Sequence, residues 1–287
     1  MASPQVSVYM TVRNGAPWVS SAIQSILQQT LSAWELIIVD DGSTDDTPRI
    51  LRSFARQDPR IQVIATGGIG RGPALNLALH HTHAPYVANL DADDLAHPQR
   101  LELELHAIRT HPAFALVASA SIVFSDRPPL EWPVYANKKV PLVDITQGLL
   151  LFNPVIHSSV LMSRAAVVAV GGYCETLQDN LDYDLWVRLA ASGYRLGLLN
   201  LPLVGKRIHP GQSFEIRRHL RYVISGARIQ RRAIRHSKAP TRHKLKAWLF
   251  LGLRIAWGFL PQRVRFWFRK KRQQLAITFG KADHSCP

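Results

Sequence analysis

Hydrophobic and polar residues follow two different periods over the first 110 residues. Short runs rich in Val and Ile, which predict strands, alternate with stretches whose apolar residues recur every three or four positions, which predict helices. Strands are expected at residues 6–12, 34–39, 61–65 and 85–90, each followed by a helical stretch. This alternation predicts an α/β fold in which helices flank a mixed, mostly parallel sheet.

The pattern is less regular after residue 110. Residues 114–124 predict a long strand, residues 143–151 a helix, residues 156–162 an extended segment, residues 181–192 an amphipathic helix and residues 195–204 a final strand. The two halves are therefore expected to differ in architecture.

The predicted strand at residues 85–90 ends in three carboxylates, those of Asp91, Asp93 and Asp94. Like charges at the end of a buried strand repel each other and resist desolvation unless a cation or donors compensate them. Mg²⁺ usually binds one or two carboxylates plus substrate phosphates, and ligands of open α/β sheets bind at this end of the strands. A solvated turn or a helix cap would account for one aspartate but not for three. The pattern predicts a divalent-cation site.

Composition narrows the class of protein. The 287 residues are 47% hydrophobic and 19% charged, which is typical of a globular chain with ample material for a core. Cys174 and Cys286 are the only cysteines, so a disulfide framework and a cysteine-based zinc site are excluded and a reducing compartment is favoured. Because no signal-like segment precedes the first strand, we expect a cytoplasmic protein.

The net charge of +15 hides a strong asymmetry. From Lys206 onward the chain has 21 Lys and Arg against two acidic residues, a charge of +19, whereas the preceding part has 14 against 18, a charge of −4. A mildly acidic body therefore carries a basic tail. Such a tail indicates an anionic partner, either a membrane surface or a nucleic acid.

The tail predicts two helical pieces. Residues 216–243 are rich in arginine, and residues 245–260 are apolar but interrupted by Lys246 and Arg254, so neither spans a membrane. An in-plane anchor is favoured by one apolar stripe along the helix, formed by Leu249, Leu253, Trp257 and Leu260. Three tryptophans suited to the membrane interface favour it too, namely Trp248, Trp257 and Trp267. With the basic cluster at residues 263–272, they predict peripheral attachment to the anionic cytoplasmic face of a membrane. A helical hairpin packed on the body is the alternative. No nucleic acid is expected, because no binding motif accompanies the charge.

The chain resembles the family 2 glycosyltransferases, which have the Rossmann-like GT-A fold, through five motifs in the family's order. They lie at residues 6–14, 35–45, 91–94, 171–173 and 182–186, and the third contains the family's DxD motif. The resemblance covers about residues 5–213. It implies a GT-A catalytic domain at 1–213, with a nucleotide-binding half at 1–110 and an acceptor half at 111–213. A basic, amphipathic helical extension follows at 214–287.

The resemblance implies an inverting, metal-dependent glycosyltransferase that takes a sugar from a nucleotide-diphosphate donor, expected to be a UDP-sugar. The acceptor would be a hydroxyl of a surface glycan or of a lipid-linked acceptor, as in polysaccharide biosynthesis. One alternative is transfer to a polyprenyl phosphate. Another, from a different class, is a non-catalytic scaffold or nucleic-acid-binding protein that uses the basic tail.

The resemblance also implies roles on the nucleotide side. Asp41 would accept a hydrogen bond from the imide of a uracil-like base, since a carboxylate only accepts. Thr11 and Asn14 would line the same pocket. Arg71 would face the nucleotide, although the sequence around it departs from the family's Ala-Arg-Asn. Asp91 would hold the ribose or the metal shell.

On the metal side the resemblance makes Asp93 the ligand of Mg²⁺ or Mn²⁺, with Asp91 in its shell and Asp94 in support. His209 would contact the metal or the diphosphate from a closing loop.

On the acceptor side Asp182 would be the general base, although Leu181 replaces the glutamate that the family commonly has beside it. His157 and Trp186 are the further acceptor-side candidates. Structural roles are the alternative for both: a lone histidine is more often structural, and a helical tryptophan more often lies in the core.

Overall fold

The computed structural model describes residues 3–125, 132–136, 140–209, 219–237 and 239–259. The strands are β1 Val6–Val12, β2 Trp34–Asp41, β3 Ile61–Thr66, β4 Tyr86–Asn89, β5 Leu95–Ala96, β6 Phe114–Phe124, β7 Leu142–Asp144, β8 Val160–Ser163 and β9 Arg195–Arg207. The helices are α1 Val19–Leu27, α2 Thr47–Gln57, α3 Arg71–His80, α4 Arg100–Thr110, α5 Arg164–Ala169, α6 Leu181–Ala191, α8 His219–His236 and α9 Thr241–Phe259, with 3₁₀ turns η1 Thr146–Leu150 and η2 His157–Ser159.

These strands form one sheet in the order β3-β2-β1-β4-β8-β6-β9-β5, and β7 pairs with β9. Strands β1 to β4 are mutually parallel, as the alternation of strands and helices predicts, and β6 and β9 are parallel as well. Strand β8 runs antiparallel to both β4 and β6 and joins the two parallel groups. The predicted α/β architecture with a mixed, mostly parallel central sheet is confirmed.

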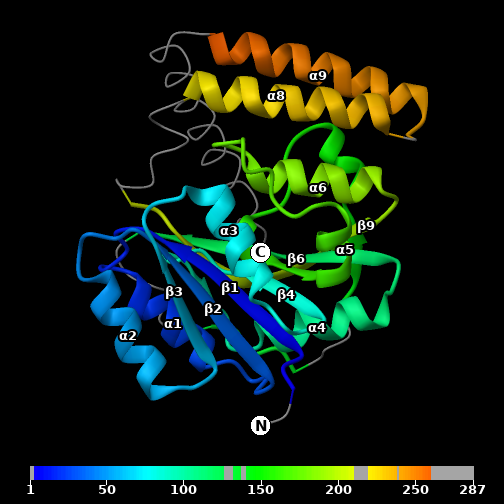
Figure 1. Cartoon of the computed structure of the whole chain (residues 1–287). Coiled ribbons are helices and arrows are strands. Elements are labelled where there is room, and N and C mark those ends of the chain that lie inside the picture. Colours follow the sequence, from blue (N-terminus) through cyan, green and yellow to red (C-terminus); the bar gives the residue numbers. More distant parts are fainter. Residues whose placement is uncertain (1–2, 126–131, 137–139, 210–218, 238, 260–287) are drawn as a thin grey trace, which may run out of the picture.

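Helices cover both faces of the sheet (Figure 1). Alternate side chains of β1 point to opposite faces of the sheet. Val6, Val8 and Met10 pack with α1 and α4 on one face. Tyr9 packs with α3 and α6 on the other. Strands β1, β2 and β4 therefore have two buried sides, and they end together at one edge of the sheet. That edge carries the acidic residues.

Two predictions for the irregular half were only partly right. Residues 143–151 do not form an α-helix, since Leu142–Asp144 is the strand β7 and a 3₁₀ turn follows it. The Asp144 carboxylate accepts hydrogen bonds from the backbone N–H (2.9 Å) and hydroxyl (2.6 Å) of Thr146, which turns the chain there. Residues 156–162 are extended only from Val160, after η2.

The tail forms a hairpin of α8 and α9, and α8 packs against α6 (Figure 1). Apolar residues of α8, including Ala227, Ile229 and Ile234, belong to the same buried cluster as Leu185 of α6. Within residues 219–237 and 239–259 the tail is therefore helical, in the arrangement given above as the alternative, a hairpin packed on the body. Leu260, Trp267 and the cluster at 263–272 lie outside the described residues, as does the side chain of Trp257. Among the helices that the structure describes, none is long and apolar enough to cross a bilayer.

A buried ion pair supports the end of β4. Arg100 and Glu104 are both fully buried, and the Arg100 guanidinium donates to the carbonyl oxygens of Asn89 (2.9 Å) and Val160 (3.0 Å). Burial raises the pKa of Glu104 to about 7, although the Arg100 charge and a hydrogen bond from Ser119 act in the opposite direction.

We expect Arg100→Met to lower the free energy of unfolding by about 3–5 kcal/mol, because it leaves the Glu104 carboxyl buried without its partner. Urea denaturation measures the loss. The double variant Arg100→Met/Glu104→Leu is the control and should recover most of the stability. Equal losses in the two variants would contradict this account.

Candidate active site

Asp41 lies at the carboxyl end of β2 and holds the glycine-rich loop that precedes α3. Its carboxylate accepts hydrogen bonds from the Thr66 hydroxyl (2.8 Å) and from the backbone N–H groups of Ile69 (2.6 Å) and Gly70 (3.0 Å). Gly70 has φ 97°, a conformation that favours glycine. A carboxylate can accept about four hydrogen bonds. Asp41 can therefore accept one more, which is the number that its predicted contact with a base requires.

Asn14 joins the loops that follow β1 and β2. Its side-chain oxygen accepts from the Thr44 N–H (2.8 Å), and its own N–H donates to the Ser43 hydroxyl (2.8 Å). Thr11 lies on β1 opposite Val39, next to the same edge. Both residues are at the nucleotide side of the sheet, and Asn14 has a clear structural function there. Their contact with a base stays a prediction.

Arg71 opens α3 and reaches Asp91, just beyond β4. Its Nη2 lies 3.2 Å from the nearer Asp91 oxygen, and its side chain remains about half exposed at 49%. The charge of Asp91 raises the pKa of the Arg71 guanidinium most, and the carboxylates of Asp182 and Asp93 add to the effect. The structure therefore brings Arg71 into contact with Asp91, 20 positions away in the chain, and the charges of Asp93 and Asp182 also act on the guanidinium.

Asp91 is the centre of this cluster. Its N–H donates to Ser158 Oγ (3.1 Å), and its carboxylate accepts from Asn89 Nδ2 (3.1 Å) and lies 3.3 Å from His157 Nδ1. Burial raises the pKa of Asp91, but Arg71 and His157 lower it more, so the carboxyl titrates well below its usual range. Asp91 is therefore an anion over the whole physiological pH range.

His157 is buried beneath the cluster. Its Nδ1 lies 3.0 Å from Asn89 Nδ2, and its Nε2 lies 2.6 Å from the hydroxyl of Tyr173, which in turn lies 2.5 Å from the hydroxyl of Tyr9. This chain of polar groups fixes the imidazole against Asp91. Sequence reasoning found His157 but missed Asn89, Tyr173 and Tyr9. The Gly-Gly-Tyr motif was the signal for Tyr173.

Tyr173 is held in place by the turn before it. Gly172 has φ 62°, and a Cβ there would lie only 2.6 Å from the Asn76 side-chain oxygen. Asn76 of α3 accepts from the Tyr173 N–H (2.8 Å) and donates to its carbonyl oxygen (2.9 Å). The motif at 171–173 therefore fixes the second half of the chain to α3.

Asp93 and His209 form the candidate metal pair. Asp93 Oδ2 lies 3.1 Å from His209 Nε2, and the His209 ring stacks on Trp18 with centroids 3.8 Å apart. Trp18 was not predicted, because nothing in the sequence links α1 to the chain after β9. Within the described residues no three His, Cys, Asp or Glu side chains converge as metal ligands. Mg²⁺ is usually held by one or two carboxylates plus substrate phosphates, so the Asp93 carboxylate is the member of this pair that fits such an ion.

Asp94 closes the floor of the site. It accepts hydrogen bonds from the Ser158 hydroxyl (2.5 Å) and the Arg207 N–H (2.9 Å). Burial, followed by the charges of Asp91 and Asp93, raises the pKa of Asp94 to about 7. A cation at Asp93 would offset the negative charges of Asp91 and Asp93 that act on Asp94. The charge of this cluster therefore supports the fit of a divalent ion to these residues.

Asp182 and Asp184 of α6 differ sharply in environment. Asp182 is half-buried and accepts from Asn153 Nδ2 (2.7 Å), whereas Asp184 is buried and pairs with Arg188 (2.8 Å) and Arg232. Only Asp182 is therefore available to a substrate.

Trp186, predicted on the acceptor side, is fully buried in the core with its ring 6.3 Å from that of His157. In this structure it packs behind the site rather than lining it.

The site thus combines a carboxylate cluster at the edge of the sheet with a separate, half-buried aspartate, Asp182 of α6. Comparison with known proteins identifies the family. The model of the glycosyl transferase family 2 matches residues 7–165. The chain belongs to this family and is a glycosyltransferase, as the sequence motifs imply.

Relatives match over nearly the whole chain. EpsE of Bacillus subtilis (strain 168), which is named as a glycosyltransferase, is 30% identical over 94% of this chain and 95% of its own. The amylovoran biosynthesis glycosyltransferase AmsE of Erwinia amylovora is 28% identical over 88% of this chain and 92% of its own. The match therefore includes part of the tail.

Solved structures confirm the fold. S. aureus TarS 1-349 in complex with UDP-GlcNAc superposes with a TM-score of 0.69 at 17% identity, over 87% of this chain and 72% of that one. The mannosyltransferase PcManGT from Pyrobaculum calidifontis, in complex with GDP-Man and Mn²⁺, gives 0.65 at 22% identity over 100% and 78%. The predicted GT-A fold is confirmed.

Proposed function

We propose that this glycosyltransferase is metal-dependent and inverting, and that it moves a sugar from a UDP-linked donor to a hydroxyl of a surface-glycan or lipid-linked acceptor. The observation that carries the proposal is a pair of contacts at the carboxyl edge of the sheet, Arg71 with Asp91 (3.2 Å) and Asp93 with His209 (3.1 Å). Similar proteins support it. AmsE is a glycosyltransferase of amylovoran biosynthesis, the TarS structure holds UDP-GlcNAc, and the PcManGT structure holds GDP-Man and Mn²⁺.

The nucleotide lies against the ends of β1, β2 and β4. Asp41 accepts from the base with its remaining lone pair, beside Thr11 and Asn14, and Asp91 receives the ribose. The half-exposed Arg71 guanidinium meets the diphosphate, which suits its planar donors.

Asp93 and His209 would hold Mg²⁺ or Mn²⁺. A divalent ion held there would supply positive charge to offset the charge that grows on the leaving diphosphate. The stacking of His209 on Trp18 orients the imidazole toward Asp93.

Asp182 takes the proton of the acceptor hydroxyl as that oxygen attacks the anomeric carbon from the face opposite the diphosphate. The hydrogen bond from Asn153 orients the carboxylate and leaves its other oxygen for the acceptor. One displacement from the opposite face inverts the anomeric configuration.

A panel of UDP- and GDP-sugars, assayed for nucleotide release with and without Mn²⁺ and Mg²⁺, tests this function. We expect release from a UDP-sugar that requires the metal. Nucleotide release from GDP-sugars only would overturn the assignment of uracil as the base. Transfer of the sugar to polyprenyl phosphate rather than to a hydroxyl would favour that alternative acceptor. No release from any donor would contradict the proposal.

We further propose that the tail holds the enzyme at the anionic cytoplasmic face of a membrane. A row of leucines on the outer face of α9 supports this: Leu245, Leu249 and Leu253 are 71%, 67% and 61% exposed. They are spaced one helical turn apart, and the helix also carries Arg242, Lys244 and Lys246. Apolar residues beside basic ones are typical of helices that lie in the membrane interface.

We expect Leu245→Gln/Leu249→Gln/Leu253→Gln to weaken binding to vesicles with anionic lipid by at least about tenfold, because each leucine loses part of the roughly 1.5–3 kcal/mol of full burial. Vesicle sedimentation measures it. Val134→Gln/Val143→Gln/Val168→Gln, which changes equally exposed residues of the body, is the matched control. Truncation of the chain before α8 would remove part of the buried core and so would not test membrane attachment alone. Unchanged binding by the leucine variant would contradict the attachment.

A further inference from the structure

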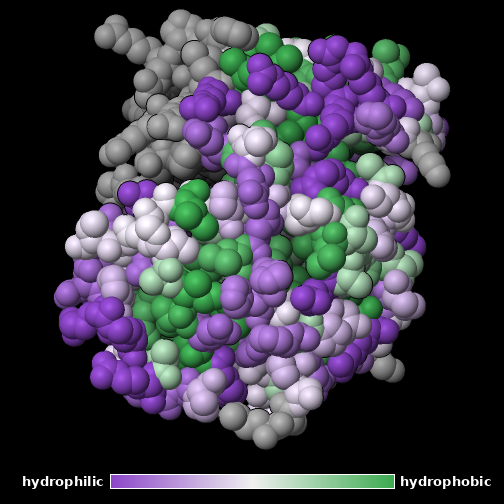
Figure 2. Space-filling model, in the orientation of Figure 1, coloured by the Kyte–Doolittle hydropathy of each residue, from purple (hydrophilic) through white to green (hydrophobic). Residues whose placement is uncertain are grey.

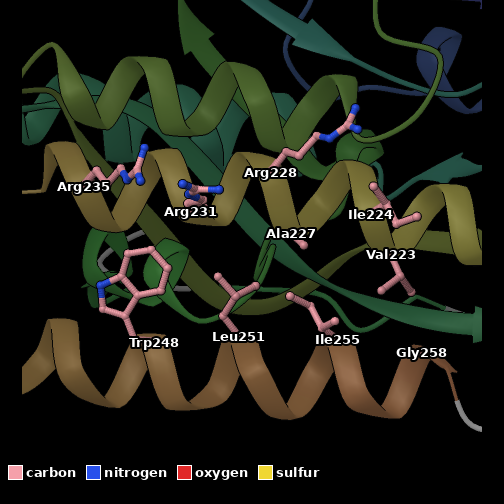
Figure 3. A pocket seen from close by; sticks show the side chains of 10 residues that line it. All are labelled: Val223, Ile224, Ala227, Arg228, Arg231, Arg235, Trp248, Leu251, Ile255 and Gly258. Atoms are coloured by element: carbon pink, nitrogen blue, oxygen red, sulfur yellow. The ribbon is translucent and has the colours of Figure 1, made fainter.

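A groove of about 470 Å³ runs between α8 and α9 (Figure 3). Apolar side chains from both helices form its floor; they are Val223, Ile224, Ala227, Trp248, Leu251 and Ile255. The helices come closest at Gly258, where a Cβ would lie 2.9 Å from Val223. The groove is therefore an apolar slot between two helices that are in contact at one end.

Arginines follow one side of this groove. Arg228, Arg231 and Arg235 lie three and four positions apart on α8, so they share one face, and all three are exposed. None of them has an ion pair or hydrogen bond among the residues that the structure describes, whereas their neighbour Arg232 pairs with Asp184 of α6. From His219 to Phe259 the chain has ten Lys and Arg and no Asp or Glu. No acidic residue of the hairpin is available to neutralise the three arginines.

An occupant of this groove must be apolar along its length and anionic at its side. The space-filling view shows hydrophobic and strongly hydrophilic residues next to each other over the hairpin, at the top of the molecule (Figure 2). A second copy of the chain would bring another hairpin with no acidic residue, so repulsion disfavours it. The sugar acceptor is disfavoured too, because every lining residue comes from α8 or α9 and none from the strand ends that carry the acidic cluster.

We infer that the groove between α8 and α9 binds one anionic phospholipid of the membrane. Its acyl chains cover Ile224, Trp248 and Ile255, which are 42%, 40% and 37% exposed, and its phosphate lies against Arg228, Arg231 and Arg235. Guanidinium groups suit phosphate because they donate two parallel hydrogen bonds. The site rests on the proposed membrane location for its source of lipid, but it does not depend on the sugar-transfer reaction.

The groove is connected to the helix that carries Asp182. Tyr222 of α8 accepts a hydrogen bond from Asn180 (3.1 Å), which precedes α6, and Arg232 pairs with Asp184. A lipid in the groove therefore binds to a helix that is fixed to the acceptor side of the active site.

The test is binding of monomeric dihexanoyl-phosphatidylglycerol to the full chain, measured by calorimetry without any sugar donor. We expect saturable binding of one lipid per chain. Arg228→Gln/Arg231→Gln/Arg235→Gln should bind at least about tenfold more weakly, because each cation near an anionic lipid contributes about 1 kcal/mol. The matched control is Arg49→Gln/Arg52→Gln/Arg56→Gln on α2, which removes three exposed arginines and should bind like the native chain.

Three further ligands separate the sources of the phosphate. Dihexanoyl-phosphatidylcholine, the deacylated headgroup glycerophosphoglycerol and inorganic phosphate should each bind at least about tenfold more weakly than the anionic lipid. Equal binding of any of them, equal losses in both triple variants, or no lipid binding by the native chain would overturn the site. If the native chain binds single-stranded RNA more tightly than the anionic lipid, and the α8 variant loses this binding, the three arginines form a nucleic-acid site instead of a lipid site. Unchanged thermal unfolding in both variants is required for the comparison.

Discussion

Asp182→Asn is expected to lower kcat by about 10²–10⁴-fold, the usual contribution of a general base. Asparagine keeps the size of the side chain and can still contact Asn153, but it cannot take the proton of the acceptor hydroxyl. Because Asp182 is half-buried and has no salt bridge among the described residues, the fold should tolerate the change. Steady-state kinetics with the donor found by the panel, together with UDP affinity, measure the effect.

The affinity for UDP should not change, since Asp182 belongs to the acceptor side. Asp46→Asn is the control, because Asp46 lies on the surface at the start of α2 with its side chain 67% exposed, and it should keep full activity. An Asp182→Asn enzyme with native kcat would remove Asp182 from the mechanism. A parallel loss of UDP affinity would instead indicate a structural role.

Asp93→Ala is expected to lower kcat/KM by at least about 10³-fold, because metal stabilisation of the leaving group contributes several kcal/mol and each 1.36 kcal/mol is tenfold. The Asp93 carbonyl oxygen, which accepts from Arg207 Nε (3.0 Å), is kept in the variant, so the loop should remain in place. Activity measured over a range of Mn²⁺ concentrations tests the assignment.

His209→Ala should need a higher Mn²⁺ concentration for half-maximal activity, because the ion would lose one of its two protein ligands. Its fold is checked by thermal unfolding, since the Trp18 stack is lost as well. A metal requirement that is the same in native, Asp93→Ala and His209→Ala enzymes would place the ion elsewhere.

The first half of the fold and the position of the site could be predicted from the sequence. Strands β1, β2 and β4 are buried on both sides, so their apolar runs stand out, and three aspartates directly after such a run have no role in a core. The short edge strand β7 was missed because Val143 is 52% exposed and the segment is too short for a clear period.

Contacts between distant segments could not be predicted. The stack of Trp18 on His209 joins residues 191 positions apart, and the polar chain from Asp91 to Tyr9 passes through a histidine whose sequence context is ordinary. Asp182 and Asp184 are only two positions apart in α6, and nothing in the sequence indicates that Arg232 of the tail pairs with Asp184. Tertiary pairing decided which aspartate stays accessible.

The most direct test follows the sugar released from the donor into water by ¹H NMR, once with Mn²⁺ and once with excess EDTA. The account predicts that the first free sugar to appear, before mutarotation, has the anomeric configuration opposite to that of the donor, and that none is released in EDTA. A first product with retained configuration, or an equal rate in EDTA, would contradict a metal-dependent inverting transfer at Asp93 and Asp182.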